Sequence, residues 1–431
     1  MPDQSPEIHL PVAQGFSSRF RRTAEPATGW RVGGVVRSAR CQLVRPVLRR
    51  ARAGVVNRAR RVARWLGAVR IGTTPALTDY KAPNYWLDYR CGFVRRGLPG
   101  ELLRRMVGGT PTHRQVTVFA AGLSQAAALS VVPMAIQVSR RAPDRLHQVV
   151  AATLLVLSPL TSSLLLYDVG RYDAVGVLVL ALLVAARSVW ARLPLPVAAV
   201  LLAAGVGLAT ATEEFLFAVV APAAAAAVRS AGGPDLSPGR RLLLLCAVLA
   251  PGAAVAGVSL LVPAPRAALH AARDEATRAG VGPPGVMGDA LAALDRSLVE
   301  NLAFFRLFEP TPIVQSLTLW SGLYLVTAML LGRLLGPRRS YHALAGVQGV
   351  VGAALCTVGA DFRRWWGLAL LGLVATIGLL EPDESVGSVD SVPTRVVVGA
   401  ALLTLAGLRL RHITVYPWGP VRVDRALPVT L

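Results

Sequence analysis

Apolar runs of about 20 residues recur along this chain between residues 115 and 410. A run of about that length can cross a lipid bilayer as one α-helix, because it matches the thickness of the hydrocarbon core. Two of the runs, 214–228 and 365–380, are short and are candidates for a broken or re-entrant helix. We therefore predict an all-α, polytopic transmembrane bundle of about nine or ten spans. The predicted spans are 115–138, 147–166, 172–191, 195–212, 214–228, 241–263, 318–336, 341–360, 365–380 and 393–410.

Composition supports a membrane protein and argues against nucleic-acid binding. The 431 residues are 53% hydrophobic with a mean hydropathy of +0.50, which is high for a soluble protein. The formal net charge of +22 comes almost wholly from arginine, since Lys81 is the only lysine. These arginines gather at the ends of the apolar runs, where the positive-inside rule places them. We predict a multi-pass protein of a bacterial plasma membrane, with membrane lipid and no nucleic acid as partners.

The same patterns divide the chain into three parts. Residues 1–78 form a basic tail, in which the segment 19–70 holds many arginines and one acid, Glu25, and suits anionic lipid. Residues 79–410 form the membrane domain, which includes a long loop over 263–315, and residues 411–431 form a second tail.

The connections between spans alternate in charge, which predicts their sides. The arginine-rich set should be cytoplasmic: Ser139–His147, Arg187–Pro194, Arg229–Arg241 and Gly332–Ser340. The acid-bearing set should face outside: Tyr167–Asp173, Thr210–Glu214, Pro263–Gln315 and Ala360–Trp366.

Two segments do not fit this alternation. Asn84–Met106 falls outside, so a cytoplasmic basic tail would need a crossing before residue 79, yet Ala51–Leu77 is rich in arginine. The alternation also fails near the carboxyl end, unless the short span 365–380 does not fully cross.

Charged residues at span ends are candidate functional residues, because charge at membrane depth is costly. The "YDVGRYD" turn holds Asp168, Arg171 and Asp173, with the first two on one helical face. The alternative for this turn is a salt-bridged connection. Glu213 and the adjacent Glu214 need a basic partner from elsewhere, unless they form a solvated turn.

A third group, "ADFRRWW", contains Asp361, Arg363, Arg364 and Trp365. Adjacent arginines can bind a phosphate through paired hydrogen bonds, so they are candidate anion ligands on an outer loop. A lipid-headgroup anchor is the alternative, because tryptophans gather at membrane interfaces.

The stretch "NYWLDYRCGFVRRGLPGELLRRM" precedes the first span and combines an acid with an arginine pair, Asp88 with Arg95 and Arg96. After Pro99 it predicts an amphipathic helix on the outer face, with Leu102, Leu103 and Met106 opposite Arg104 and Arg105. Such an element could bind a lipid phosphate and offer a base, or it could be a plain interfacial helix.

These residues carry a resemblance to known proteins. "DYRCGFVRRGLPGELL", the aspartate–glycine–arginine turn, "TEEFLF" and "ADFRRW" resemble the GT-C glycosyltransferases and the EpsG/Wzy-type polysaccharide polymerases over about residues 79–380. The resemblance implies a catalytic carboxylate in the first outer loop, here Asp88 or Asp79, and a polyprenyl-phosphate sugar donor held by Arg95 and Arg96. This chain has Thr212-Glu213 where relatives carry a His-Glu pair.

The predicted function is transfer of a sugar from that donor to an envelope glycan acceptor at the outer face. The candidate catalytic residues are Asp88, Asp168 and Asp361, and the candidate binding residues are Arg95, Arg96, Arg171, Glu213, Arg363, Arg364 and Trp365. We predict no cofactor and no metal ligands, with a divalent metal left open as a source of positive charge. Two alternatives remain: a transporter or flippase for a lipid-linked saccharide, and a non-catalytic subunit of an envelope-assembly complex.

Overall fold

The computed structural model describes one compact unit within Ile71–Leu431. The described residues are 77–167, 169–232, 236–282, 290–295, 300, 310–335, 339–359, 361–380, 393–410, 413–416 and 419–422. Nearly all of the predicted basic tail, residues 1–76, lies outside them. Helices dominate the unit, as predicted, and the strands β1 (Ile413–Tyr416) and β2 (Gly419–Arg422) form a small antiparallel hairpin.

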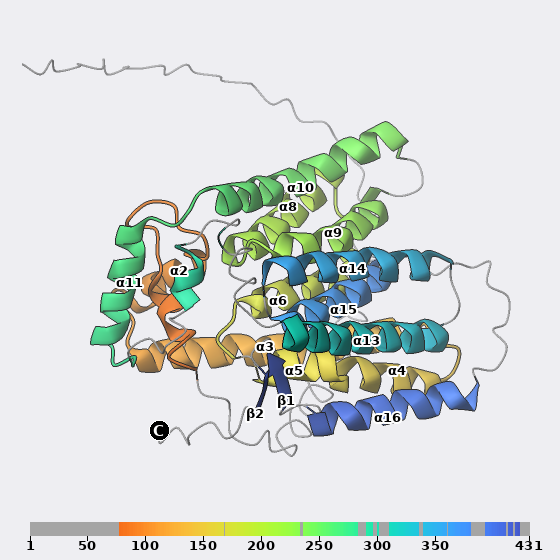
Figure 1. Cartoon of the computed structure of the whole chain (residues 1–431). Helices are drawn as coiled ribbons and strands as arrows, with labels where there is room; N and C mark the ends of the chain where they lie inside the picture. The colour runs from red at the N-terminus through yellow and green to blue at the C-terminus, as the bar shows by residue number, and fades with distance from the viewer. Residues whose placement is uncertain are drawn as a thin grey trace, which may run out of the picture. The chain divides into compact units, whose positions relative to one another are not determined.

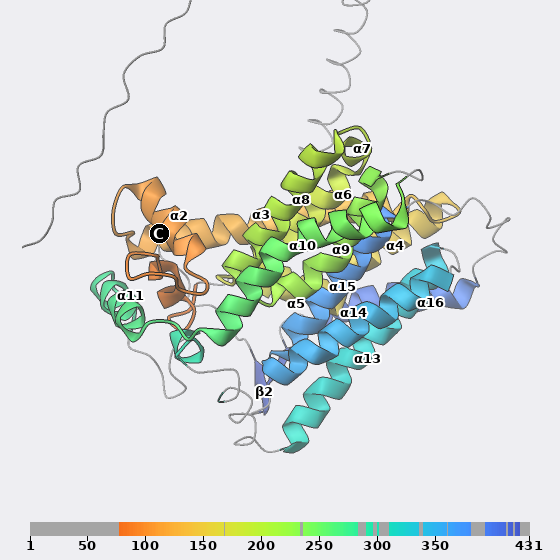
Figure 2. The ribbon, with the colours of Figure 1, turned by 90° about the horizontal axis from the view of Figure 1, so that it is seen from above.

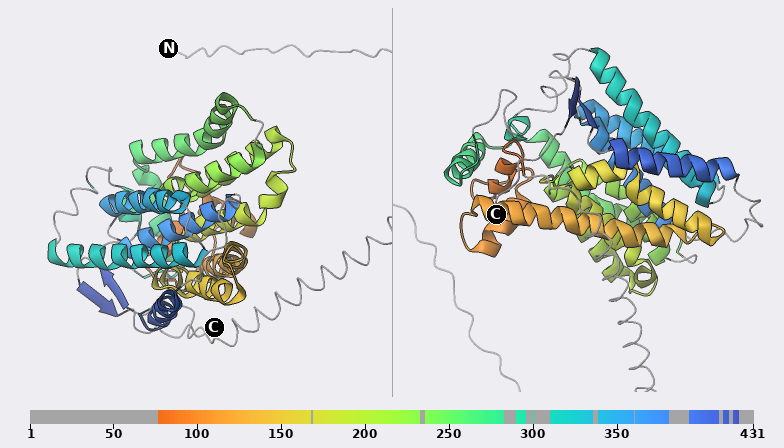
Figure 3. Two further views of the ribbon diagram at one scale, coloured as in Figure 1. Left: turned by 90° about the vertical axis from the view of Figure 1, so that its right-hand side faces the viewer. Right: turned by 90° about the horizontal axis from the view of Figure 1, so that it is seen from below.

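Every predicted span corresponds to helix in the structure. The helices are α3 (His113–Ser139), α4 (Arg145–Leu157), α5 (Pro159–Tyr167), α6 (Asp173–Ala185), α7 (Arg187–Trp190), α8 (Leu195–Thr212), α9 (Leu216–Gly232), α10 (Pro238–Leu261), α13 (Pro310–Leu335), α14 (Arg339–Val358), α15 (Phe362–Leu379) and α16 (Thr394–Leu410). Local signals set several boundaries: Thr112 and Gln115 form a capping box at the start of α3, and Asp144 caps α4. The long helices run side by side (Figure 1), and α3 and α16 lie on the near side when the unit is seen from below (Figure 3, right).

Among the described residues, four helices are long and apolar enough to cross a membrane, namely α3, α8, α10 and α13. The bent pair α4–α5 makes a fifth if it is one span, and α6, α9 and part of α16 are shorter apolar helices. These helices indicate a multi-pass membrane protein. The number of nine or ten crossings stays a prediction.

The break in the bundle falls at a different span from the two short ones named above. α4 and α5, which together match the span 147–166, meet at an angle of 47°. The break falls at Pro159, whose ring disfavours helical backbone at the preceding residue, and Ser158 has a non-helical ψ of 151°. By contrast, α15 is an unbroken helix of 18 residues, although it covers the short span 365–380.

α15 lies at the centre of the bundle, and all 18 of its residues are buried. It packs against α14, α9, α5, α6 and α13, which surround it in Figures 1 and 2. Small residues allow this packing: a Cβ at Gly367 would approach the Leu160 carbonyl oxygen, and one at Gly372 would approach the Val219 carbonyl oxygen, each to 3.0 Å. Because nothing but protein surrounds α15, the charges at its start also lie inside the protein.

A second hydrophobic cluster forms outside the bundle, and we call the segments that build it, 77–112, 262–282 and 290–295, the cap. The cap contains η1 (Ala82–Trp86), α2 (Leu98–Val107), α11 (Arg266–Arg278) and η2 (Ala290–Ala293). The predicted long loop 263–315 therefore contains an ordered helix, α11, which packs on η1. In Figures 1 and 2, α2 and α11 lie together at one end of the bundle.

The amphipathic helix predicted after Pro99 is present as α2, and one of its predicted apolar residues faces the cap. Leu103 is buried, whereas Leu102 and Met106 are exposed. Arg104, expected on the opposite face, turns inward to bind Asp88 and Glu275. Cap packing therefore decides the orientation of α2.

Candidate functional site

The two sets of loops lie at opposite ends of the bundle. At one end, the beginnings of α6 and α15 meet the end of α8, because Arg364 contacts both Asp173 and Glu213. At the other end, Arg141 after α3 donates to the Gly378 and Leu380 carbonyl oxygens at the end of α15, and Ser230 of α9 donates to Leu379. The acid-bearing connections thus share one end with the cap, which we call the network end.

A chain of buried ion pairs joins the cap to three helices of the bundle at the network end. Arg96 contacts Glu213 at 2.6 Å and Glu214 at 2.9 Å. Glu213 also lies 3.3 Å from Arg364, which holds Asp173 through two hydrogen bonds of 2.5 and 2.6 Å. The cap, the end of α8 and the beginnings of α6 and α15 are therefore held in one arrangement by charge.

The backbone at Arg96 is strained, and this strain places its side chain. Arg96 has φ 63°, in the left-handed region that non-glycine residues seldom adopt. The next residue must be small, since a Cβ at Gly97 would meet the Tyr89 ring at 2.9 Å and the Val94 carbonyl oxygen at 3.0 Å. Strained backbone of this kind collects at functional sites, where surrounding contacts enforce it.

Trp365 supports the network without contributing charge. Its ring lies under the Arg364 guanidinium at 4.2 Å, a cation–π contact, and packs edge-on against Phe215 at 5.6 Å. Its indole N–H donates to the Gly359 carbonyl oxygen at 3.1 Å, which fixes the connection before α15. Trp365 is therefore buried inside the protein, where it cannot act as the interfacial anchor considered as an alternative.

A second ion pair lies nearer the surface of the same end. Arg171 contacts Asp361 at 2.6 Å, and their side chains are 23% and 13% exposed, more than those of the Arg364–Asp173 pair. Arg363 and Arg95 are buried beside the network, the latter 4.0 Å from Glu214. The ion-pair chain and the charges beside it thus bring together five arginines (Arg95, Arg96, Arg171, Arg363 and Arg364) and four carboxylates (Asp173, Glu213, Glu214 and Asp361), a composition suited to an anionic ligand.

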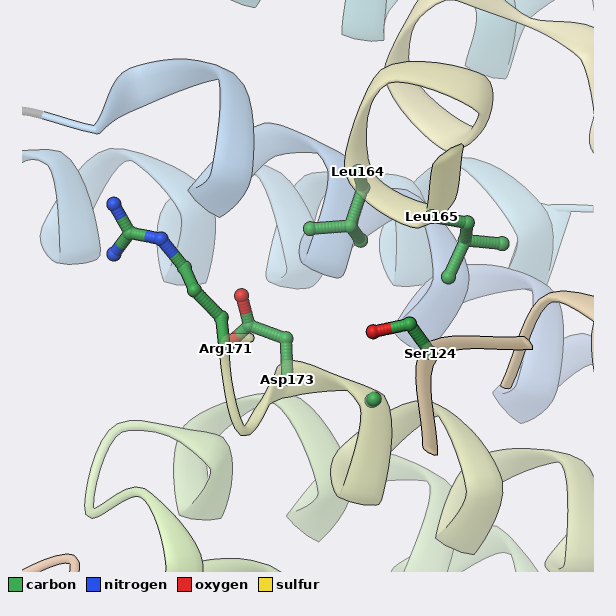
Figure 4. A pocket seen from close by; sticks show the side chains of 6 residues that line it. Ser124, Leu164, Leu165, Arg171 and Asp173 are labelled. Atoms are coloured by element: carbon green, nitrogen blue, oxygen red, sulfur yellow. The ribbon is translucent and has the colours of Figure 1, made fainter. Parts of the chain in front are cut away.

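A small pocket adjoins this group (Figure 4). It has room for about one water molecule, and part of it is open to solvent. Its apolar lining residues are Leu164, Leu165 and Ala174. Its polar lining residues are Ser124, Arg171 and Asp173. In Figure 4 the Ser124 hydroxyl points into the space between Asp173 and the two leucines. Polar and apolar side chains therefore meet at this point of the network end.

Burial and pairing set the ionisation of the two adjacent glutamates in opposite directions. Burial raises the pKa of Glu213, although the charges of Arg96 and Arg364 oppose the rise. Burial acts on Glu214 as well, but the charge and hydrogen bond of Arg96 outweigh it and lower the pKa of that carboxyl. The negative charges of Glu214 and Asp173 also raise the pKa of Glu213, whereas Arg95 helps to lower that of Glu214.

Asp88 lies in a separate ring of charges within the cap. Arg90 contacts Asp88 at 2.9 Å and Glu275 at 2.7 Å, and Arg104 contacts the same two carboxylates at 2.7 and 2.6 Å. Burial alone would raise the pKa of Asp88, but the hydrogen bonds from Arg90 and the charge of Arg104 outweigh burial and lower it. A carboxylate with a lowered pKa is a weak base, so its visible role is to join α11 to the start of the cap.

This ring makes the stability of the cap sensitive to acid. Because the folded-state pKa of Asp88 is lowered, its contribution is fully present above the ordinary aspartate pKa of about 4 and is lost as the pH falls through the folded value. We expect unfolding of the purified protein to become easier below about pH 4, and Asp88→Asn to remove part of this dependence. An unchanged acid dependence in the variant would contradict the ring's role.

The structure brings together most of the residues that the sequence singles out. Arg95, Arg96, Arg171, Glu213, Asp361, Arg363, Arg364 and Trp365 all lie at the network end. Asp88 lies in the cap ring, and Asp168 lies outside the described residues. Asp173, Glu214 and Ser124 lie at the same end, although no binding role is predicted for them from the sequence. The adjacent acids at 213–214 and the second acid of the "YDVGRYD" turn are the signals that point to the first two.

Comparisons with protein families, with curated proteins and with solved structures find no match to this chain. The site is therefore interpreted from its own residues. Within the described part of the chain, no three His, Cys, Asp or Glu residues are placed to hold a metal ion.

Proposed function

We propose that this protein is an integral membrane glycosyltransferase of nine or ten spans. It transfers a sugar from a polyprenyl-phosphate-linked donor to an envelope glycan acceptor at the outer face of a bacterial plasma membrane. The observation that carries the proposal is the group of arginines and carboxylates paired at the network end, beside the apolar side chains of Leu164 and Leu165. A polyprenyl donor has the matching chemistry, with its chain in the bilayer and its phosphate at the membrane surface.

Within this proposal, Arg171 is the arginine that contacts the donor phosphate. It lines the pocket and is the most exposed of the arginines in the network pairs. Arg96 and Arg364 are each paired with two carboxylates, so they hold the neighbouring helix ends in place and make the electrostatic potential of the site more positive. Arg95 and Arg363 add buried positive charge beside them. Positive charge fixed in advance stabilises the negative charge that develops on the departing phosphate.

Asp361 is the proposed base. It is paired with Arg171 and is more exposed than Asp173 or Glu213, so an acceptor can reach it. It takes the proton of an acceptor hydroxyl, whose oxygen forms a bond to the anomeric carbon of the sugar. The bond from that carbon to the phosphate oxygen breaks, and polyprenyl phosphate leaves with the electron pair. Asp88 is the weaker choice, because two arginines hold it as a stabilised carboxylate.

A deletion strain tests the function. Loss of one sugar from the envelope glycan, together with accumulation of a polyprenyl-phosphate sugar, is expected, and the wild-type gene should restore the glycan. The purified protein in bilayers should then release polyprenyl phosphate from that lipid when the acceptor is supplied. Movement of the lipid-linked sugar across the bilayer with its bond intact would contradict transfer and support a flippase.

The proposed orientation can be tested with a native cysteine. Cys91 is exposed in the cap, at the network end. In a variant that keeps Cys91 alone, a membrane-impermeant thiol reagent added to whole cells should label it. In the matched control, a variant whose single cysteine is Arg192→Cys at the opposite end, only opened cells should be labelled. Labelling of the Arg192→Cys variant in intact cells would contradict the orientation.

A further inference from the structure

Lys81 is an exception in the composition of this chain. Of the 46 lysine and arginine residues, it alone is a lysine. Where either cation would serve, the chain uses arginine, so this one position calls for an explanation. An ammonium group is a compact point charge, whereas a guanidinium is a wide planar fork that suits carboxylates and phosphates. A place that needs the compact cation would account for the lysine.

The surroundings of Lys81 show what the ammonium group does. The residue lies in the cap directly before η1 and is partly buried. Its Nζ donates to the Val169 carbonyl oxygen at 3.2 Å, in the turn between α5 and α6. The turn comes close to the cap here: Gly170 has φ 90°, and a Cβ on it would meet Leu77 Cδ1 at 2.1 Å and Lys81 Cβ at 3.7 Å. A compact cation therefore joins the two segments where they approach most closely.

The cap also holds the other side of the same turn. The Tyr172 hydroxyl donates to the Asn84 carbonyl oxygen at 2.8 Å, and the Val169 and Tyr172 side chains belong to the hydrophobic cluster of the cap. Arg171 lies between these neighbours, and its guanidinium contacts Asp361 at the start of α15. The position of Arg171 is therefore set by the cap as well as by the bundle.

We propose that Lys81 positions Arg171 for the phosphate of the donor, so that the cap and the phosphate contact form one unit. The ammonium group holds the backbone two residues before Arg171 without placing a second planar fork beside it. An arginine at position 81 would bring a larger cation against the same turn. The ligand of Arg171 rests on the proposed function, whereas the positioning rests on the contacts of the turn.

A double-variant cycle tests whether Lys81 acts through Arg171. The full-length protein in lipid nanodiscs is titrated with polyprenyl phosphate as wild type, Lys81→Arg, Arg171→Gln and the combination of both. Arg171→Gln should weaken binding about tenfold or more, since it removes a charge-assisted hydrogen bond to the phosphate. Lys81→Arg should cause most of the same loss, although it keeps the charge. The combination should bind no more weakly than Arg171→Gln alone, because both changes remove one contact.

Arg105→Lys is the matched control, because it exchanges the same two cations within the cap. The Arg105 side chain is 76% exposed, and its exchange should leave the affinity for polyprenyl phosphate unchanged. The thermal midpoints of the unliganded proteins add a measurement that needs no ligand. The losses caused by Lys81→Arg and Arg171→Gln should be less than additive, since both loosen one turn.

The single lysine also allows a test without any change at position 81. Reductive methylation with a ¹³C label marks only Lys81 and the amino terminus, and it keeps the positive charge. The NMR signal of methylated Lys81 should shift when polyprenyl phosphate binds, and it should also shift in unliganded Arg171→Gln. A Lys81 signal that stays in place in both cases would separate the lysine from Arg171 and overturn the inference.

Three further results overturn it: Lys81→Arg that binds as tightly as wild type, affinity losses that multiply in the combined variant, or midpoint losses that add. A wild-type protein that does not bind polyprenyl phosphate overturns the proposed function instead. The midpoints of the same four proteins, with the Lys81 signal in Arg171→Gln, then still decide whether Lys81 and Arg171 act together.

Discussion

Replacing Arg364 with leucine is expected to lower the free energy of unfolding by about 3–5 kcal/mol. The guanidinium holds Asp173 through two hydrogen bonds and contacts Glu213 at the buried start of α15. Its removal leaves the Asp173 carboxylate buried without its cation, and Glu213 keeps only Arg96. Thermal unfolding of the purified protein, followed by tryptophan fluorescence, would measure the loss.

A double variant separates the loss of the ion pair from the loss of packing. Arg364→Leu combined with Asp173→Leu removes both charges and should be more stable than Arg364→Leu alone, because no carboxylate is left uncompensated. Arg105→Ala is the surface control: its side chain is 76% exposed, and it should change stability by less than about 0.5 kcal/mol. If Arg364→Leu is as stable as Arg105→Ala, the network does not hold the helix ends together.

Asp361→Asn is expected to lower the rate of sugar transfer by about a hundred- to ten-thousand-fold, the contribution of a positioned base. The amide keeps the shape of the side chain but cannot accept the proton of the acceptor hydroxyl. Binding of polyprenyl phosphate should persist, since Arg171 keeps its charge and its place at the pocket. Single-turnover release of polyprenyl phosphate from the labelled donor would measure the rate.

Asp88→Asn is the informative comparison, because the sequence alone places the base at Asp88. We expect this variant to lose stability in acid and to retain transfer, since Asp88 is bound by Arg90 and Arg104 in the cap ring. Loss of transfer in Asp88→Asn, with Asp361→Asn fully active, would return the base to the cap. Full activity in both, and in the amide variants of Asp168, Asp173 and Glu213, would argue against a carboxylate base and favour a flippase.

Helix positions follow from local patterns that the sequence contains. An apolar run of about 20 residues must pair its backbone groups internally in a bilayer, so it forms a helix whatever its neighbours are. The span predicted at 195–212 is α8, Leu195–Thr212. The span 147–166 is broken at Pro159, whose ring disfavours helix at the residue before it, although Pro133, Pro222 and Pro251 lie inside continuous helices. The length of the apolar runs does not reveal that break, because the run 147–166 is long enough to form one span.

Ion-pair partners do not follow from local patterns. Arg96 and Glu214 lie 118 residues apart, and Arg364 and Asp173 lie 191 residues apart. Nothing in the spacing of these residues tells which carboxylate meets which arginine. Asp88 shows the consequence: its place in the first loop favours a base, whereas Glu275 and Arg104 from other elements complete a ring around it. The missing hydrogen bond of the Tyr85 hydroxyl, which has no partner among the described residues, is likewise visible only once the surroundings of that side chain are known.

The sequence by itself determined that this chain forms apolar helices, roughly where they begin and end, and which connections carry acids or arginines. These properties depend on the hydrophobicity and backbone preferences of neighbouring residues. Only the tertiary structure decided that α15 lies at the centre, that its arginines are buried, and that Arg171 and Asp173 share a pocket. Such pairings are set by helix packing, which balances contacts between residues far apart in the chain, and no local pattern encodes that balance.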